Sequence, residues 1–74
     1  MYKRIRDLRE DRDLNQTAVA KMLGMSQTGY SKYETGENDI PTWVLIKLAQ
    51  IYNTSVDYLL GLTNESEPYP KNYS

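Results

Sequence analysis

Apolar residues recur along this chain at spacings of three and four residues, which is the period of one face of an α-helix. The two clearest stripes lie in the first half of the chain and comprise Val19, Ala20 and Leu23, followed by Tyr30 and Tyr33. They predict helices over residues 16–23 and 27–35. The connection between these helices contains Gly24, and Gly36 follows the second helix where a left-handed C-cap is expected.

Short polar residues stand directly before both helical segments. Asn15 and Ser26 can each accept a hydrogen bond from an unpaired amide of a first helical turn, so both are predicted to be N-caps. Two helices joined by a turn of three or four residues that contains glycine are typical of the helix-turn-helix motif. In that motif the second helix lies in the major groove of DNA. The polar residues of this helix that can hydrogen-bond base edges are Gln27, Thr28, Ser31 and Lys32.

Further helical patterns flank this pair. Residues 2–12 predict a helix with Ile5 turned inward and charges of both signs turned to solvent. Near the other end, Ser55 is placed to cap a short helix over residues 56–60, which Gly61 terminates. The residues of this short helix that are expected to close the core are Val56, Leu59 and Leu60.

Another helix is predicted over residues 42–52, directly after Pro41, whose fixed φ suits a helix start. The residues assigned to its buried face are Leu45, Leu48, Ala49 and Tyr52. Trp43 stands four residues before Lys47 and therefore falls on the opposite, polar face. A large exposed aromatic residue beside an aliphatic one, here Val44, often marks a protein contact, because such residues anchor interfaces.

Together these patterns predict an all-α domain of five helices over residues 1–62. From Thr63 onward the chain is polar and contains Pro68 and Pro70, which a packed helix would not accept. Residues 63–74 are therefore predicted to form a flexible C-terminal tail.

The chain has 74 residues, which is room for one small domain, near the size at which a single core is only just sufficient. Cysteine and histidine are both absent, which removes disulfides, thiolate ligands, the usual zinc sites and the commonest catalytic bases. We therefore expect no metal, no cofactor and no enzymatic activity.

No apolar run approaches the roughly 20 residues that span a bilayer, and the basic residues after Met1 are not followed by an apolar signal segment. The sequence thus predicts a cytoplasmic protein that does not contact a membrane.

Charge is distributed unevenly along the chain. The net charge is −1, whereas a nucleic-acid-binding domain is usually basic. Residues 1–35 hold seven basic and five acidic residues, and residues 36–74 hold two basic and five acidic ones. The positive charge is thus concentrated in the half that contains the predicted helix-turn-helix.

Over most of its length, from Ile5 to Leu62, the sequence resembles the phage repressor and Cro class of helix-turn-helix proteins, also called the xenobiotic-response-element family. The residues that carry the resemblance are Leu14, Asn15, Gln16, Ala20, Leu23, Gly24, Ser26, Gln27, Tyr33, Glu34 and Gly36. The resemblance implies a lambda-repressor-like fold and a sequence-specific transcriptional regulator, expected to be a repressor that binds a palindromic operator in double-stranded DNA as a homodimer. It also implies that Arg9 pairs with Glu34 and thereby ties the first helix to the third.

The expected contacts with DNA fall into two groups. Base edges are expected to be read by Gln27, Thr28, Ser31 and Lys32. Contacts with the DNA backbone are expected from Gln16, Lys21 and Asn38. Of these, Gln16 occupies the first turn of a helix, where its side chain and the backbone amides can meet a phosphate with the helix dipole behind them.

The symmetric contact of the dimer is expected to involve Trp43, Val44 and Val56. In the family, the first turn of this helix lies near the dyad of the operator complex, and some relatives carry a basic residue at the Trp43 position. Tryptophan at this position shifts the balance toward protein contact, although packing of residues 68–70 of the same chain over the indole is an alternative. Two recognition helices would then lie about 34 Å apart, one turn of DNA.

Two departures from the family pattern bear on function. Gly29 stands where the family usually carries a small hydroxyl residue, and glycine inside a helix costs about 0.5 to 1 kcal/mol relative to alanine. The loop after Gly36 carries Glu37 and Asp39, whereas many relatives carry basic residues there that meet the DNA backbone. Two alternatives are therefore retained, namely an antitoxin that binds DNA and a toxin, and a protein-interaction module that kept the fold and lost DNA affinity.

Overall fold

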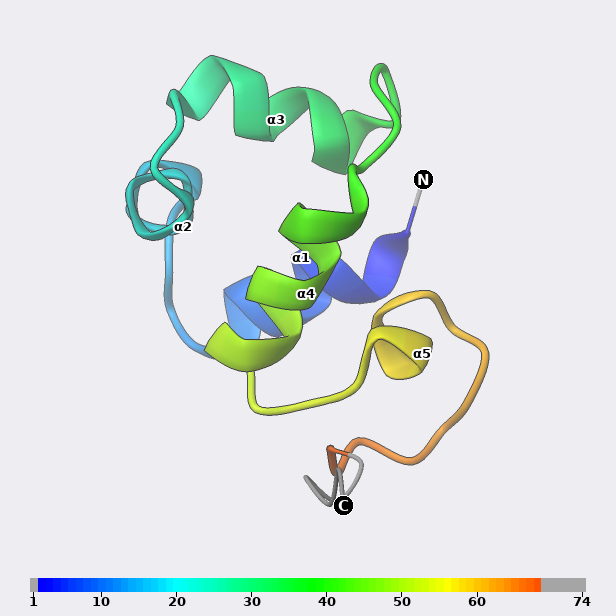
Figure 1. Cartoon of the computed structure of the whole chain (residues 1–74). Coiled ribbons are helices and arrows are strands. Elements are labelled where there is room, and N and C mark those ends of the chain that lie inside the picture. Colours follow the sequence, from blue (N-terminus) through cyan, green and yellow to red (C-terminus); the bar gives the residue numbers. More distant parts are fainter. Residues whose placement is uncertain (1, 69–74) are drawn as a thin grey trace.

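The computed structural model describes residues 2–68, which contain five α-helices and no β-strand (Figure 1). The helices are α1 (Lys3–Asp11), α2 (Gln16–Leu23), α3 (Gln27–Thr35), α4 (Thr42–Ile51) and α5 (Val56–Leu59). The predicted all-α fold of five helices is therefore confirmed. The bounds of α2 and α3 match the prediction, and the other three helices are each shorter than expected by one or two residues. None of the helices in the described part of the chain is long and apolar enough to cross a membrane.

The predicted N-caps hold the starts of three helices. The side-chain oxygen of Asn15 accepts a hydrogen bond from the amide of Ala18 at 2.7 Å, and Ser26 Oγ accepts one from the amide of Gly29 at 3.1 Å. Ser55 caps α5 in the same way. Each bond satisfies an amide that has no partner inside its own helix, so the three starts are fixed locally by the sequence.

The turn of the helix-turn-helix depends on a glycine. α2 ends at Leu23, and its C-cap is Gly24, whose φ of 72° lies in the left-handed region that favours glycine. The chain then reaches the cap at Ser26 and begins α3. In Figure 1, α2 is seen end-on while α3 lies across the view, so the two helices cross at a steep angle.

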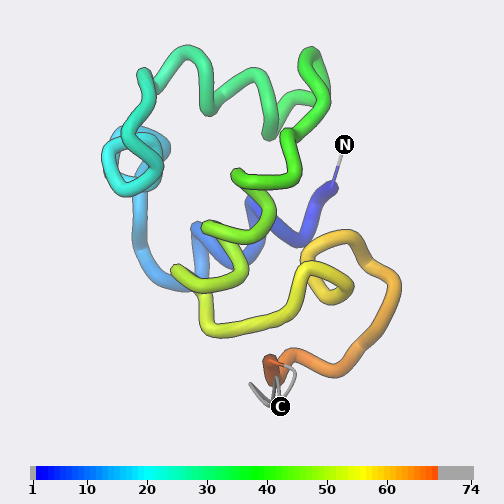
Figure 2. The backbone as a smooth tube through the Cα atoms, viewed as in Figure 1, coloured from blue at the N-terminus to red at the C-terminus, as the bar shows by residue number. Residues whose placement is uncertain are grey.

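The five helices enclose one core. α2 packs mainly against α3 and α4 mainly against α5, while α1 contacts both α3 and α5. The backbone trace shows how α4 crosses α1, with α5 beside the two helices (Figure 2). The largest side chains that are fully buried in this core are Ile5, Val19, Tyr30, Val44, Leu48, Tyr52 and Leu59.

The structure corrects the predicted buried face of α4. Val44 was expected to lie outside the core, but its side chain has 0% exposure, whereas Leu45 is only half-buried. The reason is helical geometry, because Val44 stands four residues before Leu48 and eight before Tyr52, on one stripe. The prediction that Val44 contributes to a dimer contact is therefore wrong. Trp43 does lie on the outer face, with 51% of its surface exposed.

The beginning of the predicted flexible tail is bonded to the domain. The Arg4 guanidinium donates to the carbonyl oxygens of Tyr58 at 3.0 Å and Thr63 at 2.6 Å, and it lies 4.1 Å from the centre of the Tyr58 ring. The Thr54 hydroxyl donates to the carbonyl oxygen of Ser66 at 2.6 Å. Residues 69–74 lie outside the described residues. The structure therefore does not test the alternative that residues 68–70 pack on Trp43. The domain boundary after residue 62 stays a prediction.

Candidate nucleic-acid interface

A buried ion pair joins α1 to α3 beneath the helix-turn-helix. Arg9 Nε donates to Glu34 Oε2 at 2.7 Å, and Arg9 Nη2 donates to Glu34 Oε1 at 3.0 Å. Both side chains are shielded from solvent, with 11% and 3% of their surfaces exposed. The remaining terminal nitrogen of Arg9 donates to the carbonyl oxygen of Leu14 at 2.9 Å. Arg9 therefore fixes both the end of α3 and the connection that leads into α2.

Two more groups complete the hydrogen bonding of the Glu34 carboxylate. The Tyr30 hydroxyl donates to Oε2 at 2.5 Å, and Gln16 Nε2 donates to Oε1 at 3.1 Å. Burial by itself would raise the pKa of Glu34, but the hydrogen bonds from Arg9, Tyr30 and Gln16 outweigh burial and hold this pKa below its ordinary value. The hydrogen bond with Glu34 also raises the pKa of Arg9. The pair thus remains ionised in spite of its burial.

A hydrogen bond between two glutamines extends this network to the surface. Gln27 Nε2 donates to Gln16 Oε1 at 2.7 Å, so the first residue of α3 is joined to the first residue of α2. Since Gln16 also donates to Glu34, one continuous path runs from an exposed residue of α3 to the buried ion pair. The sequence prediction treated Gln16 only as a backbone contact and missed this role. The available signal was a glutamine at the first position of both helices.

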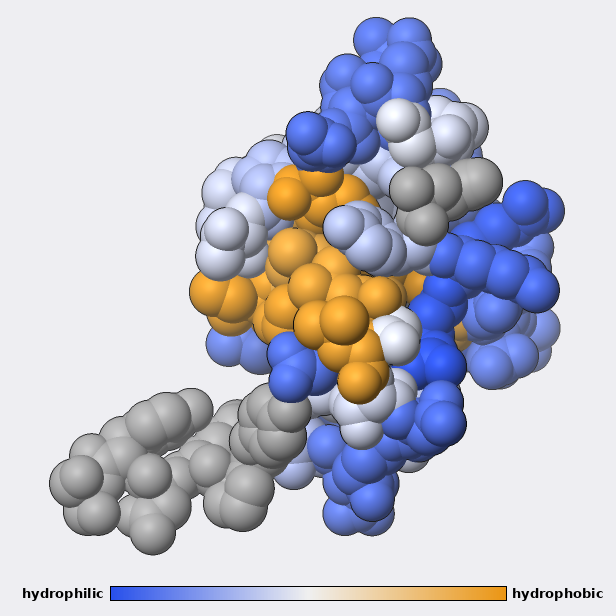
Figure 3. Space-filling view, turned by 90° about the vertical axis from the view of Figure 1, so that its right-hand side faces the viewer, coloured by the Kyte–Doolittle hydropathy of each residue, from blue (hydrophilic) through white to orange (hydrophobic). Residues whose placement is uncertain are grey.

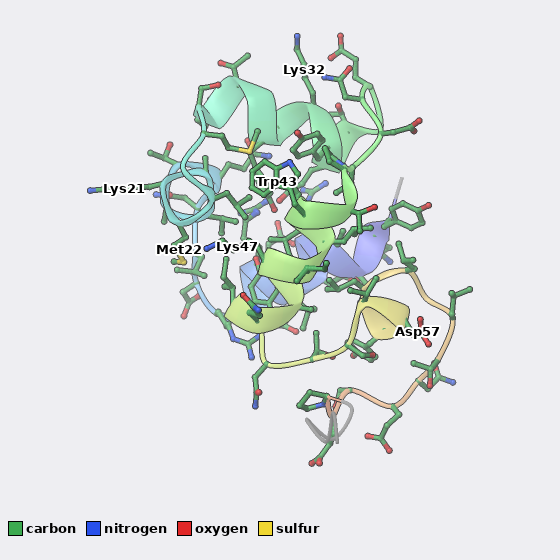
Figure 4. The ribbon with its side chains drawn as sticks, in the orientation of Figure 1. Lys21, Met22, Lys32, Trp43, Lys47 and Asp57 are labelled. Carbon is green, nitrogen blue, oxygen red and sulfur yellow. The ribbon has the colours of Figure 1, made fainter. Side chains whose placement is uncertain are left out.

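The predicted base-reading residues share the outer side of α3. Gln27 and Thr28 are exposed, whereas Ser31 and Lys32 are half-buried. Figure 4 shows the Lys32 side chain extending away from the body of the molecule beyond α3. These side chains carry amide, hydroxyl and ammonium groups and can therefore donate to the base edges of a major groove.

The predicted backbone contacts are less closely grouped. Lys21 extends from α2 in a different direction from Lys32, so the structure does not bring the two lysines together (Figure 4). Asn38 lies in the exposed loop after α3, where its backbone N–H donates to the backbone carbonyl oxygen of Lys32 at 3.1 Å. The neighbouring carboxylates of Glu37 and Asp39 are exposed as well. Of the three residues, Gln16 is the one whose side chain is bonded to a side chain of the α3 face.

Apolar side chains are also exposed at more than one place in the second half of the chain. Figure 3 shows apolar side chains gathered on the side of the molecule where α5 lies, with polar residues around them. Trp43 and Ile46 on α4 are 51% and 48% exposed, and Leu62 after α5 is 73% exposed. Val56 is half-buried and packs against the core.

Among residues 2–68, no group of acidic side chains is arranged to hold a metal ion.

Three comparisons relate this geometry to known proteins. A family model described as helix-turn-helix matches residues 5–59. An uncharacterized HTH-type transcriptional regulator, YobD of Bacillus subtilis (strain 168), is 38% identical over 69 residues, which cover 92% of this chain and 62% of that protein. The cryptic phage CTXphi transcriptional repressor RstR of Vibrio cholerae is 39% identical over 58 residues, which cover 78% of this chain and 52% of that protein. This chain thus spans between about half and two thirds of the length of these relatives.

A solved structure extends the similarity to three dimensions. The P22 c2 repressor protein, crystallised in complex with the synthetic operator 9T, superimposes with a TM-score of 0.71 at 34% sequence identity. The match covers 78% of this chain and 88% of that one. The family model covers more than half of the chain and includes α2, α3 and the buried pair of Arg9 and Glu34. The chain therefore belongs to the helix-turn-helix family.

Proposed function

We propose that this chain is a sequence-specific DNA-binding transcriptional regulator, which acts in the cytoplasm as a repressor and reads its operator with α3. The observation that carries the proposal is the polar outer face of α3, which the network of Arg9, Glu34, Gln16 and Gln27 holds against α1 and α2. A recognition helix has to be positioned rigidly, because base readout depends on hydrogen-bond geometry. The similarity to the P22 c2 repressor, solved with a synthetic operator, supports the same use of this helix.

The network leaves Gln27 able to read a base. One N–H of its side-chain amide is donated to Gln16, and the amide still has a second N–H and its carbonyl oxygen. This donor and acceptor pair matches adenine in the major groove. We assign Thr28, Ser31 and Lys32 to the neighbouring base positions, and we assign the DNA backbone to Gln16, Asn38 and Lys21.

The proposal includes a homodimer on a palindromic site. Trp43 and Ile46 expose apolar surface on one helix, and residues of this kind anchor protein interfaces. With Val44 buried in the core, the proposed contact consists of Trp43 and Ile46 on α4, and it retains the half-buried Val56 of α5. Comparing Trp43→Ala with the parent by sedimentation, on half-site and full-site duplexes, tests this contact. Unchanged cooperativity on the full site would remove Trp43 from the interface.

DNA selection followed by titration tests the central proposal. Sequences bound from a random pool are recovered, and the affinity for the selected duplex is compared with that for random DNA at a fixed, low salt concentration. Gln27→Ala and Lys32→Ala should each weaken binding by about 1 to 3 kcal/mol and relax the preference at one base position. Gln16→Ala should weaken all sequences alike. Lys47→Ala, which removes an exposed lysine of α4, is the matched control and should leave the preference unchanged.

One observation favours a second function. The exposed carboxylates of Glu37 and Asp39 in the loop after α3, together with a sequence pI of about 5.2, suit a protein-interaction module better than a DNA-binding domain. An antitoxin would combine both activities. If no duplex is preferred over random DNA at any protein concentration below aggregation, the repressor proposal fails and the interaction module replaces it.

A further inference from the structure

A depression with a volume of about 410 Å³ lies where α1 meets the helix-turn-helix. The residues that line it are Arg6, Arg9, Gln16, Glu34 and Thr35. We propose that this depression receives a backbone phosphate of the bound DNA and that Arg6 of α1, a residue outside the helix-turn-helix, is the side chain that binds it. The inference rests on the proposed DNA-binding function and adds a contact to it.

Of the two arginines that line this depression, Arg6 is the one with unused hydrogen-bond donors. Arg9 is shielded from solvent, and its nitrogens donate to Glu34 and to the carbonyl oxygen of Leu14. The side chain of Arg6 is 63% exposed, and its one ion pair within residues 2–68 joins Nε to Glu10 Oε2 at 3.3 Å. The two terminal nitrogens of Arg6 make no hydrogen bond within the described residues. A guanidinium in this state suits a phosphate, which it can bind through two parallel N–H bonds.

The walls of the depression come from the motif that would lie on DNA. Gln16 is the first residue of α2, where backbone amides lack partners inside the helix and the helix dipole favours an anion. Thr35 is the last residue of α3; it is exposed and also lines the depression. A phosphate seated between these two residues would connect α1 to the same DNA strand that passes α2.

The acidic groups of the depression do not exclude a phosphate. The Glu34 carboxylate is compensated by Arg9 and accepts further hydrogen bonds from Tyr30 and Gln16. Glu10 is 52% exposed and contacts Arg6 through a pair four residues apart on one helix. Exposed pairs of this kind are weak, so Arg6 can exchange Glu10 for a phosphate that offers bidentate geometry.

The experiment measures the salt dependence of binding for two charge-matched variants of α1. Arg6→Ala removes the proposed ligand, whereas Lys3→Ala removes an equal charge one turn away, from a residue that lines a different depression with Tyr2 and Leu59. Loss of one phosphate contact should lower the slope of log affinity against log salt by about 0.9 for Arg6→Ala. The ratio of parent to variant affinity should accordingly shrink about threefold between roughly 50 and 200 mM salt. Lys3→Ala should keep the parent slope, and both variants should keep the parent sequence preference.

A third variant tests the competition with Glu10. Glu10→Gln should strengthen binding in the parent background and have a smaller effect when combined with Arg6→Ala, because its action passes through Arg6. Thermal unfolding followed by circular dichroism shows that each variant is folded. An equal slope in Arg6→Ala and Lys3→Ala, in folded protein that still prefers its selected duplex, would overturn the inference and leave the proposed function intact. If the parent itself shows no preference for any duplex, the proposed function fails first.

Discussion

Helices α1 to α3 and helices α4 and α5 are held in the fold by different kinds of contact. At the centre of the first group a buried carboxylate accepts hydrogen bonds from Arg9, Tyr30 and Gln16. α4 and α5 instead pack on each other and contribute apolar side chains such as Val44, Leu48 and Leu59 to the core. The polar junction requires particular residue types at particular positions, whereas the apolar junction requires mainly volume. The two regions should therefore respond differently to substitution.

The largest expected effect is at the polar junction. Glu34→Ala would leave the Arg9 guanidinium buried without its partner and should lower the free energy of unfolding by about 3 to 5 kcal/mol. The surface pair of Arg6 and Glu10 provides the control, since Glu10→Ala should change stability by no more than about 1 kcal/mol. Urea titration followed by circular dichroism measures both values. Similar losses in the two variants would mean that burial does not distinguish these pairs.

Acid should weaken the same junction. The folded-state pKa of Glu34 lies below its ordinary value of 4.5, so Glu34 contributes stability above that pH and loses the contribution as the pH falls through the folded-state pKa. We expect the unfolding temperature to drop on acidification below about pH 4.5, and to drop less in Glu34→Gln. Thermal melts of both proteins across this range provide the measurement. Parallel pH profiles would show that other carboxylates govern the acid response.

On α4, two neighbouring residues should differ in how much stability and how much DNA binding they contribute. Val44→Ala removes fully buried volume and should cost about 2 kcal/mol of stability. Trp43→Ala removes a side chain that is half exposed and should cost clearly less. On full-site DNA the order should reverse, with Trp43→Ala the more harmful to cooperative binding. A larger stability loss from Trp43→Ala would place the indole within the core packing.

These two residues also show what the sequence could and could not reveal. The caps at Asn15 and Ser26, and with them the bounds of α2 and α3, were predictable because each depends on a local hydrogen bond to a short polar side chain. The choice between Val44 and Leu45 depends on the rotation of α4 against its neighbours, and an apolar stripe leaves this rotation uncertain by about one residue. The sequence therefore predicted that α4 has a buried apolar face, but not which residue lies at the centre of that face.

Only part of the polar network around Glu34 could be predicted from the sequence. The pair of Arg9 and Glu34 followed from a family resemblance, since 25 residues separate them and no local pattern links them. The bond from Tyr30 joins residues four apart on α3 and agrees with local spacing, whereas the bond from Gln16 depends on how α2 meets α3. Sequence spacing places each side chain on a face of its own helix, and the distances between helices come only from the packed structure.

The smallest expected effect concerns a residue at the end of the apolar region. The hydroxyl of Tyr52 is buried and has no hydrogen-bond partner at full bonding geometry within residues 2–68, and its nearest polar neighbour is Tyr30. Tyr52→Phe should therefore leave stability unchanged or raise it by up to about 1 kcal/mol. Tyr30→Phe is the control, because it removes a hydrogen bond to Glu34 and should lower stability by about 1 to 2 kcal/mol. Denaturant titration distinguishes the two signs. A loss in both variants would reveal a partner for the Tyr52 hydroxyl.

Alkaline pH gives a second measurement of the same residue. Burial raises the pKa of Tyr52 from 10.0 to about 12, so the unfolded chain loses this proton first and stability should decline as the pH rises through that interval. Tyr52→Phe should lack this part of the decline. An unchanged alkaline profile in the variant would assign the decline to other tyrosines.

The hydrogen bonds from Arg4 to the carbonyl oxygens of Tyr58 and Thr63 bear on the order in which contacts form during synthesis. The guanidinium binds carbonyl oxygens that lie 54 and 59 residues further along the chain. α2 and α3 can pair by local contacts, and the bonds between Arg9 and Glu34 can join α1 to them once α3 is complete. The bonds of Arg4, in contrast, require Tyr58 and Thr63. Contacts between distant parts of a chain also form more slowly than local ones. During synthesis, α1 can therefore be held to α3 through Glu34 well before Arg4 binds the segment after α5.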